Sequence, residues 1–182
     1  MKSKIHEHKS SINITAGKKI LLIVAFFTII TINYSFAQDS TKTNPLSAIL
    51  TSYYGIKDAL ISSDATATAA KAGDLVKAID GIDMNALPDA DRQAFIVVQV
   101  KLKKDAQAIA ASNKIEAQRT TFSTLSDNIY SLAKTAKLST GPVYQQYCPM
   151  KKMYWLSSEI AIKNPYYGKM MLTCGKVTDT LK

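Results

Sequence analysis

Histidine is almost absent from this chain of 182 residues, and its two copies, His6 and His8, lie among the first eight positions. Histidine is the commonest general base in enzymes and the usual partner of a nucleophilic serine or cysteine. The chain also lacks a Cys-x-x-Cys pair of the thioredoxin type and a glycine-rich phosphate loop. Its carboxylates are scattered, which disfavours catalytic zinc. These absences predict that the protein is not an enzyme.

Long apolar runs are also scarce, and the longest covers residues 20–32 after a lysine-rich start. This run is short for a membrane span, which needs about 20 residues. Ser35, Phe36 and Ala37 then place small residues where a signal peptidase cuts. We therefore expect residues 1–37 to be a cleaved signal peptide, with an uncleaved anchor as the alternative. Cleavage would make the protein periplasmic or secreted and leave no membrane span.

Acidic residues are fewer than basic ones, and the formal net charge is +9. The lysine excess is strongest from Lys137 onward, where the only acids are Glu159 and Asp179. A basic face can meet an acidic protein or an anionic membrane surface. A solvated lysine-rich surface is the simpler interpretation. Because export removes the chain from the compartment of nucleic acids, we expect no nucleic-acid partner.

Helical periodicity dominates the chain after a polar stretch at residues 38–45, which predicts a flexible linker. From residue 46, apolar side chains recur at three- and four-residue steps, the pattern of a helix with one buried face. Four such stretches follow, centred near Tyr53, Ala72, Leu102 and Leu125. Four helices with short connections predict an antiparallel bundle over residues 46–137, within a single helical domain at 46–182. The predicted fold class is all-α.

The tail, residues 143–176, contains both cysteines, the single tryptophan and five of the nine tyrosines. The helical period is lost there, and residues 143–147 could form one short strand. We expect an irregular cap on the bundle, with a turn at residues 164–168. Aromatic side chains should seal the open end of the bundle, or alternatively stack on a ligand. They are Tyr144, Tyr147, Trp155, Tyr166 and Tyr167.

Sulfur ligands in the tail leave three possibilities open. A Cys148–Cys174 disulfide suits an oxidising compartment, and would stabilise the fold by about 3.5 kcal/mol in the chain-entropy model. Alternatively, the two cysteines with Met150, Met170 and Met171 offer thiolates and thioethers, which are soft ligands that select Cu(I). Separate buried thiols are the third possibility. Arg119 is expected to form a structural ion pair with Asp58, Asp74 or Asp105.

Several short motifs together resemble an uncharacterised domain family. They are Ile115-Glu116-Ala117-Gln118-Arg119, Tyr147-Cys148-Pro149-Met150, Trp155-Leu156-Ser157, Asn164-Pro165-Tyr166-Tyr167-Gly168 and the stretch at 170–175. The resembled family, a domain of unknown function, occurs in exported bacterial proteins, alone or fused to HlyD/CusB-type heavy-metal efflux adaptors. The resemblance covers residues 46–181. It implies an exported helical domain that handles a metal, copper above all.

Two functions follow as hypotheses. The first is an exported soft-metal binding or delivery domain associated with heavy-metal efflux, with Cu(I) held by Cys148, Cys174 and the three methionines. Its partner would be an efflux adaptor or another envelope protein. The second is a disulfide-stapled interaction module that binds no metal.

Overall fold

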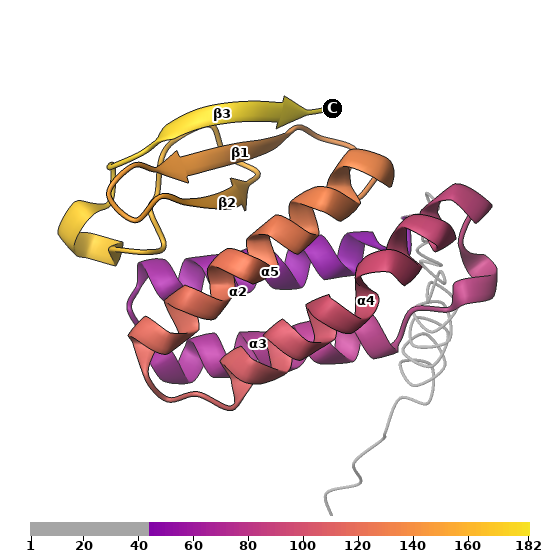
Figure 1. Ribbon diagram of the computed structural model, residues 1–182, viewed down its shortest axis with the longest axis horizontal. Helices are drawn as coiled ribbons and strands as arrows, with labels where there is room; N and C mark the ends of the chain where they lie inside the picture. The colour runs from indigo at the N-terminus through magenta and orange to yellow at the C-terminus, as the bar shows by residue number, and fades with distance from the viewer. Residues whose placement is uncertain (1–43) are drawn as a thin grey trace, which may run out of the picture. The chain divides into compact units, whose positions relative to one another are not determined.

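Four helices precede three strands in the computed structural model, which describes residues 44–182 (Figure 1). The helices are α2 (Ser47–Ile61), α3 (Ala65–Asp80), α4 (Asp89–Ala110) and α5 (Ile115–Thr135). A short 3-10 turn, η1 (Met84–Ala86), lies between α3 and α4. The four helices predicted from the apolar periodicity are therefore present.

Each helix buries the side that carries its apolar residues. Tyr53 on α2, Leu102 on α4 and Leu125 on α5 are fully buried. The start of α3 is fixed by Asp64, whose side chain accepts a hydrogen bond of 2.8 Å from the Ala67 N–H. Such a cap satisfies one of the free N–H groups in the first helical turn. Periodicity and capping together thus account for the helical part of the chain.

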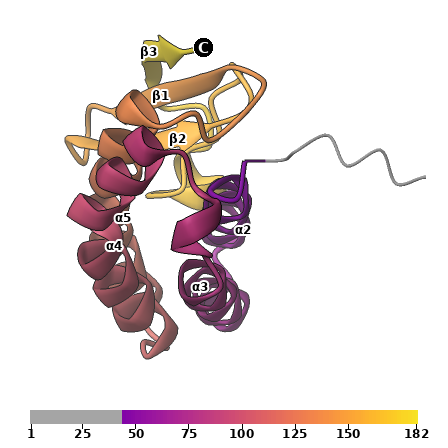
Figure 2. The same ribbon diagram turned by 90° about the vertical axis from the view of Figure 1, so that its right-hand side faces the viewer.

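The helices form two hairpins, α2 with α3 and α4 with α5, which also meet through α3 and α4. Figure 2 shows the hairpins side by side, with the strands lying over α2 and α5. Helix α5 contacts the second strand of the sheet directly. One continuous apolar core joins the bundle to the sheet, because Trp155 and Tyr166 belong to the same buried cluster as the helical residues.

The chain ends in a three-stranded antiparallel sheet, so the predicted all-α class is wrong. Its strands are β1 (Val143–Cys148), β2 (Met153–Ser157) and β3 (Lys176–Leu181), in the order β2-β1-β3. The expected short strand at 143–147 corresponds to β1, whereas β2 and β3 lie within residues expected to be mostly irregular. Each of the three is only five or six residues long, and their backbone groups pair with one another rather than within a helix.

Strand β2 lies at one edge of the sheet, and tyrosine hydroxyl groups cover that edge. The Tyr53 hydroxyl accepts a hydrogen bond of 2.9 Å from the Leu156 N–H. The Tyr166 hydroxyl donates to the Tyr154 carbonyl. An unpaired strand edge can pair with another chain. These two bonds occupy the Leu156 N–H and the Tyr154 carbonyl on the free edge of β2. The Tyr53 bond also fastens the sheet to α2.

The predicted signal peptide at 1–37 and residues 38–43 of the predicted linker lie outside the described residues. The end of that linker is fastened to the helices. Asn44 donates side-chain hydrogen bonds to the Asp91 carboxylate at 3.0 Å and to the Lys137 carbonyl at 2.6 Å. Its own side-chain oxygen accepts from the Leu46 N–H at 2.9 Å, just before α2 begins. Within residues 44–182, no helix combines the length and apolar character that crossing a membrane requires.

Candidate functional site

The five sulfur residues predicted as a site come from three segments that meet at one end of the sheet. Cys148 ends β1, Met150 lies in the turn to β2, and Cys174 precedes β3. The short 3-10 helix η2 (Gly168–Met171) carries Met170 and Met171. Strands β1 and β3 run antiparallel with Tyr147 opposite Lys176, which brings both cysteines to the same end. We call this region, visible beside η2 in Figure 1, the sulfur end of the sheet.

The five side chains differ in their access to solvent. Cys148 is fully buried and lies opposite Met153 in the β1–β2 ladder. Cys174 and Met171 are half-buried. Met150 and Met170 are 62% and 76% exposed. Both cysteines are free thiols in this structure. The sulfur end therefore presents one thiol and three thioethers at or near its surface, with the second thiol beneath.

Harder ligands do not gather at this end or elsewhere in the described part of the chain. No group of three or more His, Cys, Asp or Glu side chains lies close enough there to hold an ion. A zinc or calcium centre normally requires such a group. The candidate donor set is therefore restricted to thiol and thioether sulfur.

Lysines surround the sulfur end. Lys151 and Lys152 lie in the β1–β2 turn, Lys169 lies in η2, and Lys176 begins β3. The Lys151 ammonium lies 5.3 Å from the centre of the Tyr167 ring and 3.9 Å from a carboxylate oxygen of Glu116. This cation–π contact joins the β1–β2 turn to the residue that precedes η2. The sulfur end is thus positively charged, as the late lysine excess suggested.

The predicted aromatic cap divides into buried and partly exposed members. Trp155 and Tyr166 are fully buried, and their rings meet edge to face at 6.0 Å. Tyr147 contacts Tyr154 across the strands, with ring centres 4.7 Å apart and planes tilted by 40°, and Tyr154 is 37% exposed. Tyr144 and Tyr167 are half-buried. The two buried rings join the sheet to the bundle, as expected for a seal.

A chain of hydrogen bonds runs beneath these rings. The Leu156 N–H donates to the Tyr53 hydroxyl, which contacts the Ser126 hydroxyl at 2.8 Å. Ser126 in turn donates to the Phe122 carbonyl on α5. Burial raises the pKa of Tyr53 well above its ordinary value, so its hydroxyl keeps its proton and serves as both donor and acceptor. The sheet, α2 and α5 are thereby joined through one phenol.

Asn164 organises the loop that leads to the sulfur end, and it is fully buried. Its side-chain amide donates to the Cys174 carbonyl at 2.7 Å, and its side-chain oxygen accepts from the Tyr166 N–H at 2.8 Å. Its own N–H donates to the Leu172 carbonyl at 2.7 Å. The Gly168 N–H donates to its carbonyl at 3.0 Å. One side chain thus fixes the backbone on both sides of η2.

Arg119 fastens the same loop to the helices and is 4% exposed. Its guanidinium donates to the Pro165 carbonyl at 3.0 Å, to the Ser63 hydroxyl at 2.9 Å and to Glu116 at 2.6 Å. The expected structural role is therefore present, but Glu116 replaces the predicted aspartate partners. Glu116 lies three positions before Arg119 in the helix, and this i,i+3 spacing is one at which side chains can pair.

The sequence patterns did not identify Tyr53, Asn164 and Gly168 as residues that position the site. Gly168 has a φ of +56°, and a Cβ there would lie 2.6 Å from the Ser63 hydroxyl oxygen. The Asn-Pro-Tyr-Tyr-Gly turn was recognised as a turn, but its contact with the α2–α3 connection depends on tertiary packing. The sequence signals for this turn are Gly168 and the position of Asn164 directly before Pro165.

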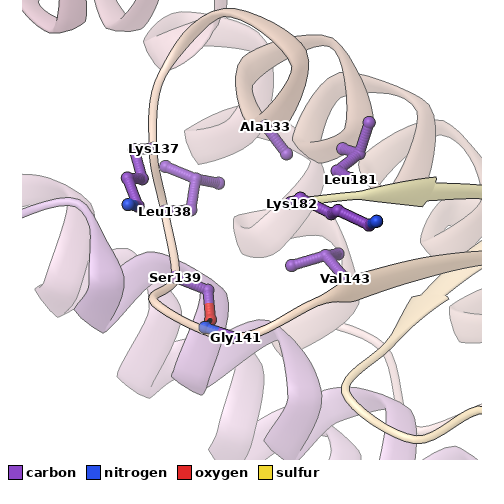
Figure 3. Close-up of a pocket in the computed structure, with 8 residues that line it drawn as sticks. All are labelled: Ala133, Lys137, Leu138, Ser139, Gly141, Val143, Leu181 and Lys182. Carbon is purple, nitrogen blue, oxygen red and sulfur yellow. Dashed lines mark hydrogen bonds between the residues drawn. The ribbon is translucent and has the colours of Figure 1, made fainter.

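A small hollow lies at the opposite end of the sheet, between the end of α5 and the strands β1 and β3 (Figure 3). Leu138, Val143 and Leu181 line it together with Gly141. Its volume is about 20 Å³, which suffices for one water molecule at most. It is separate from the sulfur end and too small for a cofactor or substrate.

Comparison with known proteins yields one match. A model of the family described as "Protein of unknown function (DUF3347)" matches residues 49–141, just over half of the chain. The match covers the four helices and stops before β1, so every residue of the sulfur end lies beyond it. No curated protein and no solved structure matches the chain.

Proposed function

Because this chain belongs to the DUF3347 family of proteins of unknown function, we propose its role from its own residues: it binds a soft metal ion, copper(I), at the sulfur end of the sheet. The ion is cargo to be buffered or handed on, and no reaction is catalysed. Cys174, Met150, Met170 and Met171 would supply the surface ligands, with the Cys148 thiol beneath them.

One observation carries this proposal: two methionines at the sulfur end are largely exposed to solvent. Methionine is apolar and normally fills gaps in a core. Met150 and Met170 are instead 62% and 76% exposed, and in the chain they lie two residues after Cys148 and four residues before Cys174. Thioether and thiolate sulfur bind copper(I) in preference to harder ions. The donor chemistry therefore fits a soft ion.

The lysines around the sulfur end fit delivery better than permanent storage. Lys151, Lys152, Lys169 and Lys176 would attract an acidic surface on a partner protein. In the setting suggested by the resemblance, that partner is an adaptor of a heavy-metal efflux system or another envelope protein. Export through a cleaved signal peptide, to the periplasm or outside the cell, forms part of the same proposal.

Competition titrations against a copper(I) chelator test the proposal under reducing conditions, on protein recovered from cells that express the full chain. Wild type should bind one ion. Cys174→Ser should weaken binding at least about tenfold, because it replaces the charged soft ligand that reaches the surface. Met150→Leu and Met170→Leu keep the apolar volume and should give smaller losses. Met153→Leu, opposite Cys148 in β2, is the matched control and should bind as wild type does. Equal binding by wild type and Cys174→Ser would refute the site.

A disulfide-stapled interaction module is the second candidate. The pairing of β1 with β3 favours it, because it brings Cys148 and Cys174 to the same end of adjacent strands. A thiol count on protein taken directly from the export compartment separates the two functions. Two free thiols together with copper(I) binding support the metal site. No free thiol and no copper(I) binding after reduction support the staple.

A further inference from the structure

Helix α4 exposes a row of large aliphatic side chains on the side away from the core. Val97 and Val100 are 72% and 73% exposed, and Ile96 is 45% exposed. Elsewhere on the described helices, the comparable side chains are buried or half-buried. Isolated exposed apolar residues are ordinary, but three within five positions form a contiguous patch. We call this row, Ile96, Val97 and Val100, the α4 patch.

A cleft of mixed character adjoins the α4 patch, with the Lys103–Asp80 ion pair among its apolar lining residues. It has a volume of about 280 Å³ and lies between the end of α3, η1 and α4. Phe95, Ile79 and Met84 contribute to its lining, and Val100 belongs to both the cleft and the patch. Interfaces form where anchoring side chains can enter such recesses. The patch and the cleft together offer a ridge beside a groove, the arrangement by which helices pack.

Charge along α4 indicates which partner fits. Asp89 and Asp91 outnumber Arg92 in the first turn, whereas three lysines, at 101, 103 and 104, outnumber Asp105 in the second half. Lys103 pairs with Asp80 of its own chain, which leaves Lys101 and Lys104 for a partner. A partner helix that runs antiparallel should therefore be basic beside the start of α4 and acidic beside its end. Another copy of α4 in antiparallel orientation has this order. The antiparallel arrangement also opposes the two helix dipoles.

We propose that α4 pairs with α4 of a second copy of this chain, antiparallel and about a two-fold axis between Ile96 and Val97. The α4 patches then face each other, and Asp89 of each copy lies opposite Lys104 of the other. Both side chains are exposed: the Asp89 carboxylate is 90% exposed although it pairs with Arg92 in its own helix. A two-fold axis makes the contact self-complementary and closed, so assembly stops at a dimer.

The dimer uses one helix and one cleft from each copy, which is a small interface. Interfaces at the low end of the size range are weak and reversible. We therefore expect a dimer in the micromolar range, populated where the protein is concentrated. This inference is independent of the proposed metal site, because α4 carries none of the sulfur residues.

Sedimentation velocity over roughly two decades of protein concentration tests the proposal, on protein recovered from cells that express the full chain. Wild type should shift from monomer to dimer as concentration rises. Val97→Glu and Val100→Glu should each weaken association at least about tenfold, because they bury a charge without a partner. Ile160→Glu is the matched control: Ile160 is 66% exposed but lies in the loop after β2, and its variant should dimerise as wild type does.

A charge exchange tests the antiparallel arrangement itself. Asp89→Lys and Lys104→Glu should each weaken the dimer about threefold by placing like charges opposite each other. The double variant should return to wild-type association because it restores both opposite-charge pairs. Thermal unfolding of each variant confirms that it is folded, and the exchange keeps the test valid if a valine variant unfolds. A wild type that stays monomeric throughout, association unchanged in Val97→Glu, or a double variant no better than the single ones would overturn the proposal.

Discussion

Replacing Gly168 by alanine should destabilise the fold by about 3 to 5 kcal/mol. The first reason is the backbone: φ is +56°, and a residue with a Cβ in this left-handed region costs about 1 to 2 kcal/mol. The second is space, because the Cβ would lie 2.6 Å from the Ser63 hydroxyl oxygen and 2.9 Å from the Ile61 carbonyl. If Ser63 moves away, Arg119 loses a charged hydrogen bond worth about 1.5 to 3 kcal/mol.

Gly73→Ala is the matched control. Gly73 lies within α3, and no atom lies within 4 Å of the position that its Cβ would take. Alanine there should stabilise the helix by about 0.5 to 1 kcal/mol. The same chemical change should thus shift stability in opposite directions at the two sites. Urea unfolding, followed by helical circular dichroism and by Trp155 fluorescence, measures both midpoints. A Gly168→Ala variant within about 0.5 kcal/mol of wild type would refute the reasoning.

The clash itself can be separated from the backbone strain by a double-mutant cycle. Ser63 also has a positive φ, +57°, so Ser63→Gly removes the hydroxyl without straining the connection. In the Ser63→Gly background, the cost of Gly168→Ala should fall by about 1 to 3 kcal/mol. An unchanged cost would exclude the Ser63 hydroxyl as its source and leave the backbone strain at Gly168 and the contact with the Ile61 carbonyl.

Three further substitutions test contacts within the tail and between the sheet and the helices. Tyr53→Phe leaves the Leu156 N–H without its acceptor, and urea unfolding should show a loss of about 1 to 3 kcal/mol. Asn164→Leu keeps the volume but removes both side-chain hydrogen bonds around η2, so a loss of about 2 to 4 kcal/mol is expected, and a change below about 0.5 kcal/mol would contradict its organising role. The hydrogen bond from Tyr130 lowers the pKa of Asp179 below its ordinary value, and the same bond raises the pKa of Tyr130 to about 12. A lowered carboxyl pKa contributes stability that is present above the unfolded-state value near 3.8 and is lost as pH falls through the folded value. The stability difference between wild type and Tyr130→Phe should therefore shrink in acid below about pH 4, and a difference that is constant from neutral pH into acid would show that this bond carries no linkage.

The helices were predictable because their signal is local and repeated. Within α2, α4 and α5, the apolar residues recur with the helical period. Those placed on the buried side include Tyr53, Phe95, Leu102 and Leu125, and all four are buried as expected. The period of α3 was less clear, because its alanines leave the buried side poorly marked. Thr68 and Leu75 are fully buried there. Neither belongs to the apolar stripe that the sequence predicts for this helix, namely Ala65, Ala69, Ala72, Val76 and Ile79.

Strands β2 and β3 were missed for different reasons. Strand β2 buries Trp155, Leu156 and Ser157 in succession, since both of its faces are covered. Strand β3 does alternate, but its inward positions include Asp179, whose place depends on Tyr130 of α5. Such pairings join residues far apart in the chain, which local patterns do not report.

The candidate site was predictable as a set of residues but not as an arrangement. The concentration of sulfur and aromatic residues after residue 143 singles out this region in the sequence, and its role as a site stays a prediction. That Cys148 is buried while Met150 and Met170 are exposed depends on the register of β1 against its neighbours and on η2. The residues that position the loop, Arg119 and Asn164, are polar side chains buried by tertiary contacts.

The hydrogen bond between Leu156 and Tyr53 joins positions 103 residues apart in the chain. During synthesis, α2 to α5 can therefore associate before the strands exist, while the Tyr53 phenol lacks only its Leu156 partner and the Arg119 guanidinium only its Pro165 partner. Contacts of such high sequence separation form late, because a long loop must close first. The sheet therefore packs onto helices that can already be associated. If it opens transiently, the buried thiol of Cys148 becomes accessible without the helices coming apart.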